Sequence, residues 1–263
     1  MGLITVGGLG FMVWFELRQF LHDKFHGRKY LRLRNLSVHT RIVLHASLVL
    51  FLCGTGLFMI LEWNNSGTIG NMGIGSKLLV SAFQSVTLRT AGFATAAIGN
   101  CTRAMLLCMC LFMVIGGSPG GTAGGFKTTT AVIVAAGIRH TLKDDHEDPH
   151  IFRKKISYAL QQRAFSLVFL YAGFLFAGLV LLLISDGGHA DALALLFEEC
   201  SAIATVGLTT GITAAVSVPG RIILIILMYI GRIGPYVLVS ILRRREEGQR
   251  SRLHYPSADI MIG

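Results

Sequence analysis

The chain has 263 residues, of which 52% are hydrophobic and only 14% are charged, and its formal net charge is +10. In a soluble protein this charge would suggest a nucleic-acid partner, but here the basic residues gather in three polar segments, 16–41, 139–163 and 243–252. Between them lie apolar runs of about 20 residues, the length at which a helix crosses a hydrocarbon core. The totals exclude a soluble nucleic-acid-binding protein. They indicate an all-α polytopic membrane protein whose basic segments face the cytoplasm.

Two similar units follow one another along the chain. Each has a spanning run, a short apolar stretch and a second long run, which are 42–61, 78–86 and 104–138 in the first unit and 164–184, 193–204 and 221–242 in the second. A shift of 115 residues places Thr90 on Thr205 and Gly92 on Gly207, and the same shift places MVIGG (113–117) on MYIGR (228–232). A single offset shared by separated motifs indicates an internal duplication.

The short stretches are predicted to enter the membrane from outside and turn back. Both units begin and end beside a basic segment, so each spanning run goes out and each second run returns. A helix of about ten residues covers only about 15 Å and cannot cross. Irregular backbone at membrane depth survives only where it lines water or is buried in protein. The segments after these half-helices therefore belong to an aqueous path or to packed protein.

A short segment of similar sequence follows each half-helix, and we call these the filter segments: Thr90, Ala91, Gly92 and Phe93 in the first unit, and Thr205, Val206, Gly207 and Leu208 in the second. Backbone carbonyls can replace the water shell of a cation, and glycine permits the dihedral angles that this requires. The half-helices direct their negative carbonyl ends at the same point. We therefore expect a cation filter that holds K⁺ at Gly92 and Gly207. A helix and turn with an incidental glycine is the alternative, which the duplication disfavours.

The glycine-rich stretch after the first filter segment is predicted to be a loop. Its sequence is GGSPGGTAGGFKTTT, residues 116–130, and it misses the phosphate-loop motif because Phe126 separates Gly125 from Lys127. As one helix, 104–138 would measure about 52 Å, far more than a bilayer core. We expect a helix to about Ile115, a glycine loop at 116–125 and a second helix from about Phe126. The residues assigned to the loop are Gly116, Gly117, Ser118, Gly120, Gly121, Thr122, Gly124, Gly125 and Lys127.

The glycine loop could act as a gate or be a passive kink, and the hydroxyls of Ser118 and Thr122 are candidate partners for its backbone groups. A third interpretation, a nucleotide-binding membrane enzyme, depends on this glycine stretch alone. The sequence offers no nucleophile–base pair, zinc-ligand spacing or paired acids at membrane depth, so an enzyme is not expected.

Two arginines lie at positions where the transfer of a charge out of water is energetically unfavourable. Arg232 is twelve residues into an apolar run, near the middle of the membrane, and is interpreted either as a barrier facing the pore or as a structural group tied to a neighbouring helix. Arg89 directly precedes the first filter segment. It is expected to turn away from the cations, pair with Glu198 or Glu199 and thereby brace the filter.

Several motifs together resemble the Trk/Ktr/HKT superfamily of potassium transporters, most closely the membrane subunit of bacterial Ktr systems. They are FQSVTLRTAGFAT (83–95), the glycine stretch, FEECSAIATVGLTTGIT (197–213), MYIGRIGP (228–235) and YPSADIMIG (255–263). The resemblance implies four membrane–pore–membrane repeats around one K⁺-channel-like pore, with a gate at the glycine loop and a basic residue at Arg232. It also implies a homodimer in the bacterial plasma membrane, with cytosolic nucleotide-binding (RCK/KTN-type) regulatory subunits.

By this resemblance the chain holds only repeats three and four. The assignments are 1–17 for the end of the helix that closes repeat two, 18–41 for a cytoplasmic linker, 42–138 for repeat three, 139–163 for a cytoplasmic loop, 164–242 for repeat four and 243–263 for a cytoplasmic tail. Two filters are not enough to close a four-fold pore, so a non-transporting membrane fragment is the alternative, and a missing repeat could supply the partner of Arg89. K⁺ is the implied transported ion, Na⁺ a candidate coupling ion, and no covalent cofactor is implied.

Overall fold

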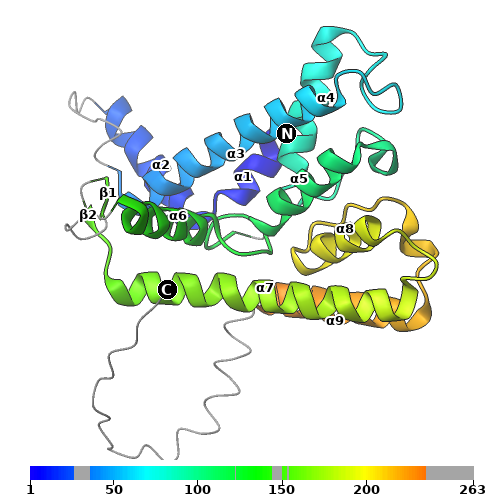
Figure 1. Cartoon of the computed structure of the whole chain (residues 1–263). Coiled ribbons are helices and arrows are strands. Elements are labelled where there is room, and N and C mark those ends of the chain that lie inside the picture. The colour runs from blue at the N-terminus through cyan, green and yellow to red at the C-terminus, as the bar shows by residue number, and fades with distance from the viewer. Residues whose placement is uncertain (27–35, 122, 144–149, 153, 235–263) are drawn as a thin grey trace, which may run out of the picture.

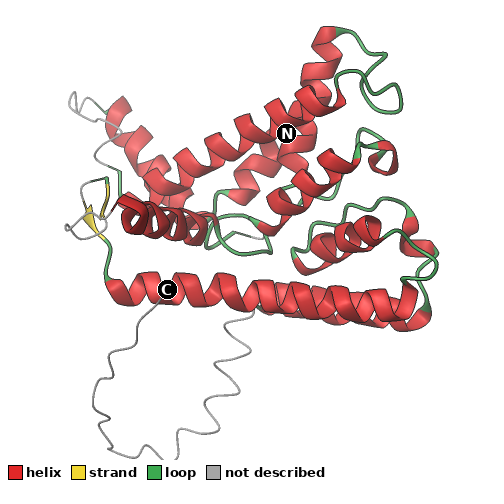
Figure 2. Ribbon diagram, viewed as in Figure 1, coloured by secondary structure: helices red, strands yellow, loops and turns green. Residues whose placement is uncertain are grey.

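The structure is a computed structural model, and it describes residues 1–26, 36–121, 123–143, 150–152 and 154–234. The helices are α1 (Gly2–Gly8), α2 (Phe11–Phe25), α3 (Val38–Glu62), α4 (Ile74–Thr87), α5 (Arg103–Val114), α6 (Thr128–Lys143), α7 (Tyr158–Asp186), α8 (Ala192–Ile203) and α9 (Val218–Ile233). Short 3₁₀ turns lie at Ile98–Asn100 and Ile212–Ala214, and β1 (His150–Ile151) pairs antiparallel with β2 (Lys154–Lys155). Figures 1 and 2 show a helical molecule in which this hairpin supplies the strands of the described part.

The long helices α3 and α7 begin the two units. Within the described residues they are the helices that are long and apolar enough to cross a membrane. Large apolar side chains stand out from α7, with Phe169 84% and Ile184 78% exposed. A soluble protein would bury such a stripe, whereas a bilayer solvates it. In Figure 1, α7 and α9 run side by side along the bottom of the view, with α8 above one end of them.

The half-helices α4 and α8 turn back between the long helices. α4 packs on α3, while α8 packs on α7 and α9 of its own unit and also on α5 of the first unit. The second run of the first unit breaks, because α5 ends at Val114 and α6 begins at Thr128. The break puts the glycine loop inside the molecule, between the units.

At the end of each long helix, one buried carboxylate forms hydrogen bonds with the start of the next full helix. Glu62, the last residue of α3, accepts hydrogen bonds from the N–H of Thr102 at 2.9 Å and its hydroxyl at 2.7 Å. Asp186, the last residue of α7, accepts from the N–H of Ser217 at 2.7 Å and its hydroxyl at 2.9 Å. Thr102 and Ser217 are the N-caps of α5 and α9. The carboxylates thus also serve helix N-termini, where negative charge is stabilising.

We expect Glu62→Gln to destabilise the fold by about 3 kcal/mol, because an amide nitrogen cannot accept the bonds that a fully buried carboxylate accepts. Glu62 also accepts from Asn65 Nδ2 at 2.6 Å and Thr68 Oγ1 at 2.8 Å. Thermal unfolding in detergent measures the loss. The matched change Asp191→Asn removes an exposed carboxylate, 4.0 Å from Arg103, and should leave the midpoint unchanged. Equal midpoints for both variants would show that the Glu62 bonds do not stabilise the fold.

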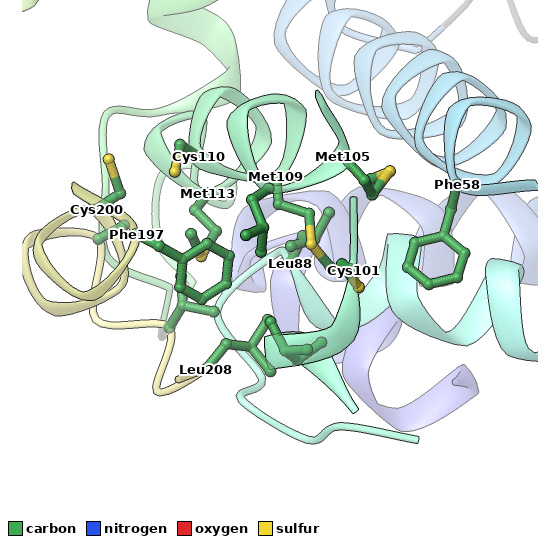
Figure 3. Packing of buried hydrophobic residues seen from close by; sticks show 14 of the residues in the cluster. Phe58, Leu88, Cys101, Met105, Met109, Cys110, Met113, Phe197, Cys200 and Leu208 are labelled. Carbon is green, nitrogen blue, oxygen red and sulfur yellow. The ribbon is translucent and has the colours of Figure 1, made fainter. Parts of the chain in front are cut away.

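The core lies between the units and is rich in sulfur. Met105, Met109 and Met113, spaced by four along one face of α5, are fully buried. In Figure 3, Met113 lies beside Phe197 of α8, whereas Met105 lies toward Phe58 of α3. Flexible thioethers fill the irregular space between a spanning helix and a half-helix. The second filter segment joins the same cluster through buried Val206 and Leu208. The position of the second filter segment therefore depends on packing against the first unit.

Helices extend into the first two basic segments. α2 continues to Phe25, beyond residue 18, where the cytoplasmic linker is expected to begin. α6 ends at Lys143 and α7 begins at Tyr158, both inside the expected cytoplasmic loop 139–163. Polar residues can extend a membrane helix into water, so charge alone marks the boundary poorly. The segment 1–17 is broken into α1 and α2, and Gly10, at φ 84°, lies at the break.

Candidate functional site

The two filter segments share an unusual backbone. φ is 65° at Thr90 and 54° at Thr205, and it is 75° at Gly92 and 90° at Gly207. Glycine adopts such angles freely, but a β-branched residue in the left-handed region carries strain of about 1–3 kcal/mol. Equivalent threonines of both units share that conformation. The positive φ angles at the threonine and the glycine are therefore a property that both units share. They turn successive peptide groups in a way that an ordinary loop does not require.

The filter segments meet at backbone contact. A Cβ on Gly92 would lie 2.4 Å from the carbonyl oxygen of Val206, a distance that real Cβ atoms do not reach. A Cβ on Gly207 would have Gly92 Cα, at 3.7 Å, as its nearest neighbour. Phe93 is 64% exposed, whereas Val206 and Leu208 are buried. Glycine is thus required at 92 by both space and conformation, and at 207 by conformation alone.

Hydroxyl groups in the half-helices hold the filter backbone. Thr87 Oγ1 accepts from the N–H of Phe93 at 2.9 Å and donates to its carbonyl at 2.7 Å. Ser201 Oγ accepts from the N–H of Gly207 at 3.1 Å, and the N–H of Ala91 donates to Thr87 O at 3.1 Å. Sequence reasoning missed Thr87 and Ser201. The available signal was a hydroxyl residue six positions before a filter residue.

The predicted ion pair between Arg89 and Glu198 is wrong for the described structure. Glu198 instead accepts from Thr209 Oγ1 at 2.6 Å, from the N–H of Thr210 at 2.9 Å and from Thr213 Oγ1 at 2.7 Å. These donors follow the second filter segment directly, so they reach the carboxylate without a long-range contact. Glu198 therefore braces the exit of its own filter segment.

Glu199 is not the partner of Arg89 either. It is fully buried, and neither carboxylate oxygen has a hydrogen-bond partner in the described part of the chain. It fits a notch on α7, where a Cβ on Gly178 would lie 2.3 Å from Glu199 Oε1. The guanidinium of Arg89 also has Nε and Nη2 unpartnered among these residues. The proposed bracing by a cross-unit ion pair is therefore absent from the described structure.

The two ends of the glycine loop pair with each other through a parallel bridge between Ile115 and Phe126, which closes the loop. The N–H of Gly116 donates to Phe126 O at 3.0 Å, the N–H of Phe126 donates to Val114 O at 3.2 Å, and the N–H of Thr128 donates to Gly117 O at 3.1 Å. These bonds tie the end of α5 to the start of α6. They satisfy backbone groups that would otherwise be unpaired at membrane depth.

The segment between α1 and α2 holds the tip of the glycine loop through two backbone hydrogen bonds. The N–H of Ser118 donates to Gly8 O at 3.0 Å, and the N–H of Phe11 donates to Gly120 O at 3.2 Å. The hydroxyl of Ser118 bonds a side chain, Thr128 Oγ1 at 3.1 Å, whereas sequence reasoning expected the loop backbone. Thr122 lies outside the described residues. The glycine loop is thus held by the segment between α1 and α2 as well as by the pairing of its own ends.

The glycine loop lies directly against the second filter segment. A Cβ on Gly124 would lie 2.2 Å from Thr205 Oγ1 and 2.5 Å from Ala204 O. Lys127, which follows the loop, donates from Nζ to Ala123 O at 2.7 Å. The backbone of the loop at Gly124 therefore packs closely against the side chain of Thr205 and the carbonyl group of Ala204.

Arg232 lines a cavity beside the second filter segment. The cavity has a volume of about 500 Å³, and Thr205, Gly207 and Glu198 also line it. Arg232 lies in the last turn of α9. Arg232 therefore borders the same cavity as residues of the second filter segment.

Two long apolar helices, each followed by a short helix that turns back, are the arrangement of a helical membrane protein. The family model described as "TrkH: Cation transport protein" matches residues 1–251, and the chain belongs to this family. The family that the sequence motifs resemble is thereby confirmed. The solved structure of the potassium transporter TrkH from Vibrio parahaemolyticus has the same fold, with a TM-score of 0.68 at 16% identity over 91% of this chain and 50% of that one.

Two curated relatives that match nearly the whole of this chain are named as potassium or potassium/sodium uptake proteins. The chain is 34% identical to Ktr system potassium uptake protein B of Vibrio alginolyticus over 100% of this chain and 54% of that protein. It is 31% identical to potassium/sodium uptake protein NtpJ of Enterococcus hirae over 99% of this chain and 56% of that protein. The chain thus spans about half the length of the curated relatives that it matches.

Proposed function

We propose that the chain forms half of a pore for potassium uptake across the bacterial plasma membrane, within a Trk/Ktr-type system. The observation that carries the proposal is the matched left-handed backbone of Thr90 and Thr205, each followed by a left-handed glycine. Such alternation aims carbonyl oxygens at a common line, where they replace the hydration shell of K⁺. The family and the names of the relatives support the choice of ion.

In this proposal the filter residues of both units bind K⁺ near Gly92 and Gly207, at the carbonyl ends of α4 and α8. The negative pole of each half-helix favours the cation there. The hydroxyls of Thr87 and Ser201 keep the strained backbone from relaxing. The site needs no covalent cofactor, since the chemistry is the exchange of water for carbonyl oxygen.

The glycine loop serves as the gate and Arg232 as an electrostatic barrier. The contact of Gly124 with Thr205 and the cavity shared by Arg232 and the filter support these roles. The complete transporter is a homodimer controlled by a cytosolic nucleotide-binding subunit of the RCK/KTN type, and the chain's C-terminal tail is cytoplasmic. Na⁺ is a candidate coupling ion, which the potassium/sodium name of one relative favours.

The decisive experiment uses a bacterial strain that lacks its own potassium uptake. One arm expresses the chain alone, and the other a chimaera in which the first two repeats of Ktr system potassium uptake protein B of Vibrio alginolyticus precede Met1. The chimaera is expected to restore growth at low potassium and to take up rubidium, while the chain alone does neither. A chimaera that reaches the membrane intact but transports nothing would favour the alternative of a non-transporting fragment.

We expect Gly124→Ala in this chimaera to raise basal rubidium uptake and weaken its control by the nucleotide-binding subunit. The added methyl group would push the loop away from Thr205 and Ala204. Gly7→Ala is the control, because a Cβ there meets nothing within 4 Å. If both variants keep the wild-type rate and response, the glycine loop is a passive connection.

A further inference from the structure

Each half-helix inserts one polar side chain into a glycine notch on the long helix of its own unit. A Cβ on Gly54 of α3 would lie 2.5 Å from Ser85 Oγ, and a Cβ on Gly178 of α7 would lie 2.3 Å from Glu199 Oε1. Both glycines lie eight residues before the carboxylate residue that ends their helix. Ser85 and Glu199 therefore occupy equivalent places in the two units.

These two positions also have the same relation to the filter. Ser85 lies two residues before Thr87, and Glu199 lies two residues before Ser201. Thr87 and Ser201 are the hydroxyl residues that hold the filter backbone. The contact in each notch therefore sets where the half-helix lies along the long helix, and with it the position of the hydroxyl that holds the filter.

The first unit shows which hydrogen bond is made in the notch. Ser85 donates from Oγ to the backbone carbonyl of Phe51, at 2.8 Å, and Phe51 lies three residues before Gly54. The carbonyl three residues before Gly178 belongs to Leu175. An acceptor is therefore expected in the second notch, in the place where the first notch has one.

The carboxyl group of Glu199 lies close to this acceptor. The backbone N–H of Leu179, which is the helical partner of the Leu175 carbonyl, is next to that carboxyl group. Both oxygens of Glu199 are nevertheless buried without a hydrogen-bond partner in the described part of the chain. An ionised carboxylate can only accept, whereas a protonated carboxylic acid has one O–H donor. A carboxyl group that faces a carbonyl is thus satisfied only when it holds a proton.

The surroundings of Glu199 do not compensate a negative charge. Within the described residues no basic side chain pairs with it. The neighbouring ionisable groups are uncharged, namely the hydroxyl of Tyr171 on α7 and the thiols of Cys200 on α8 and Cys110 on α5. On α9, Arg221 bonds backbone carbonyls near the start of the helix, and Arg232 borders the filter cavity, which Glu199 does not line. A buried charge without a counter-ion is strongly unfavourable, and a bound proton removes it.

We propose that Glu199 carries a proton in the folded protein and, as a neutral carboxylic acid, donates a hydrogen bond to the backbone carbonyl of Leu175. This bond takes the place of the one that Ser85 donates in the first unit. Glu199 is then a positioning residue, because it holds α8 where Ser201 reaches the N–H of Gly207. The protonation state goes beyond the proposed function, whereas the effect of the bond on uptake rests on it.

Infrared spectroscopy of the purified chain in detergent tests the proton directly. The difference between the spectra of wild type and Glu199→Gln should contain the C=O stretch of a protonated carboxylic acid, which an ionised carboxylate lacks. Glu198→Gln is the matched control, because the adjacent carboxylate accepts hydrogen bonds from Thr209, Thr210 and Thr213 and should give only carboxylate bands. Each variant is first shown to elute as the same folded species as wild type. Carboxylate bands without an acid band for Glu199→Gln overturn the proposal.

Two substitutions of Glu199 in the chimaera test the hydrogen bond. The amide of Glu199→Gln has N–H donors for the Leu175 carbonyl, whereas the thioether of Glu199→Met has none. We expect Glu199→Gln to take up rubidium at the wild-type rate and Glu199→Met to be slower by about fivefold, the effect of one ordinary hydrogen bond. Equal uptake by the two variants overturns the positioning role. An inactive wild-type chimaera counts against the proposed function alone, because the infrared band is read without transport.

Discussion

Potassium uptake through the chimaera should fall by about tenfold or more in Gly92→Ala, and by less in Gly207→Ala. Both positions have positive φ, at 75° and 90°, so alanine strains either backbone by about 1–3 kcal/mol. Only at Gly92 would the new Cβ also lie 2.4 Å from Val206 O, inside the other filter segment. This clash at Gly92 would displace the carbonyl group of Val206, which is proposed to bind the ion.

Rubidium uptake at equal amounts of membrane protein measures this difference. Gly73→Ala is the control, because that residue has φ −64° and a Cβ there meets nothing within 4 Å. It should transport at the wild-type rate. Equal activity in Gly92→Ala and Gly73→Ala would mean that the conducting backbone lies elsewhere, because a filter cannot absorb a clash of this size.

The architecture could be predicted because it follows from lengths and repeats. The run 104–138 is too long for one helix in a bilayer, and glycines are the places where it can break, so the loop between Val114 and Thr128 follows from helix geometry. The offset that relates Thr90 to Thr205 needs only the sequence, and in the structure it relates the two strained threonines. The family, inferred from five short motifs, is shown by the match over residues 1–251.

The partners of the charged residues could not be predicted, because they depend on contacts far apart in sequence. Glu62 accepts a hydrogen bond from Thr102, which lies forty positions later in the chain, and nothing in the sequence around either residue indicates this pairing. Glu198 was assigned to Arg89 by counting available charges, whereas the structure satisfies it with three threonines of the neighbouring turn. Charge counting overlooks neutral donors, which in a buried setting serve a carboxylate equally well.

Arg232→Ala in the chimaera should raise rubidium flux by about thirtyfold. A positive charge about 8 Å from a passing K⁺ repels it by about 2 kcal/mol at an effective dielectric constant of about 20, and alanine removes that term. The cavity that Arg232 shares with Thr205 and Gly207 is the reason to place this repulsion on the ion path. Arg232→Lys keeps the charge and should keep the flux low.

Arg221→Ala separates this barrier from a general effect of arginine on α9. Arg221 lies near the other end of the helix, where Nε donates to Val216 O at 2.9 Å and Nη2 to Ala214 O at 2.7 Å, so it anchors a turn rather than facing the filter. Its loss should leave flux unchanged or slightly reduced. A structural Arg232 predicts the opposite order, with less transport and a lower unfolding midpoint in Arg232→Ala. The sign of the flux change therefore decides between a charge that slows the ion and one that only holds a helix.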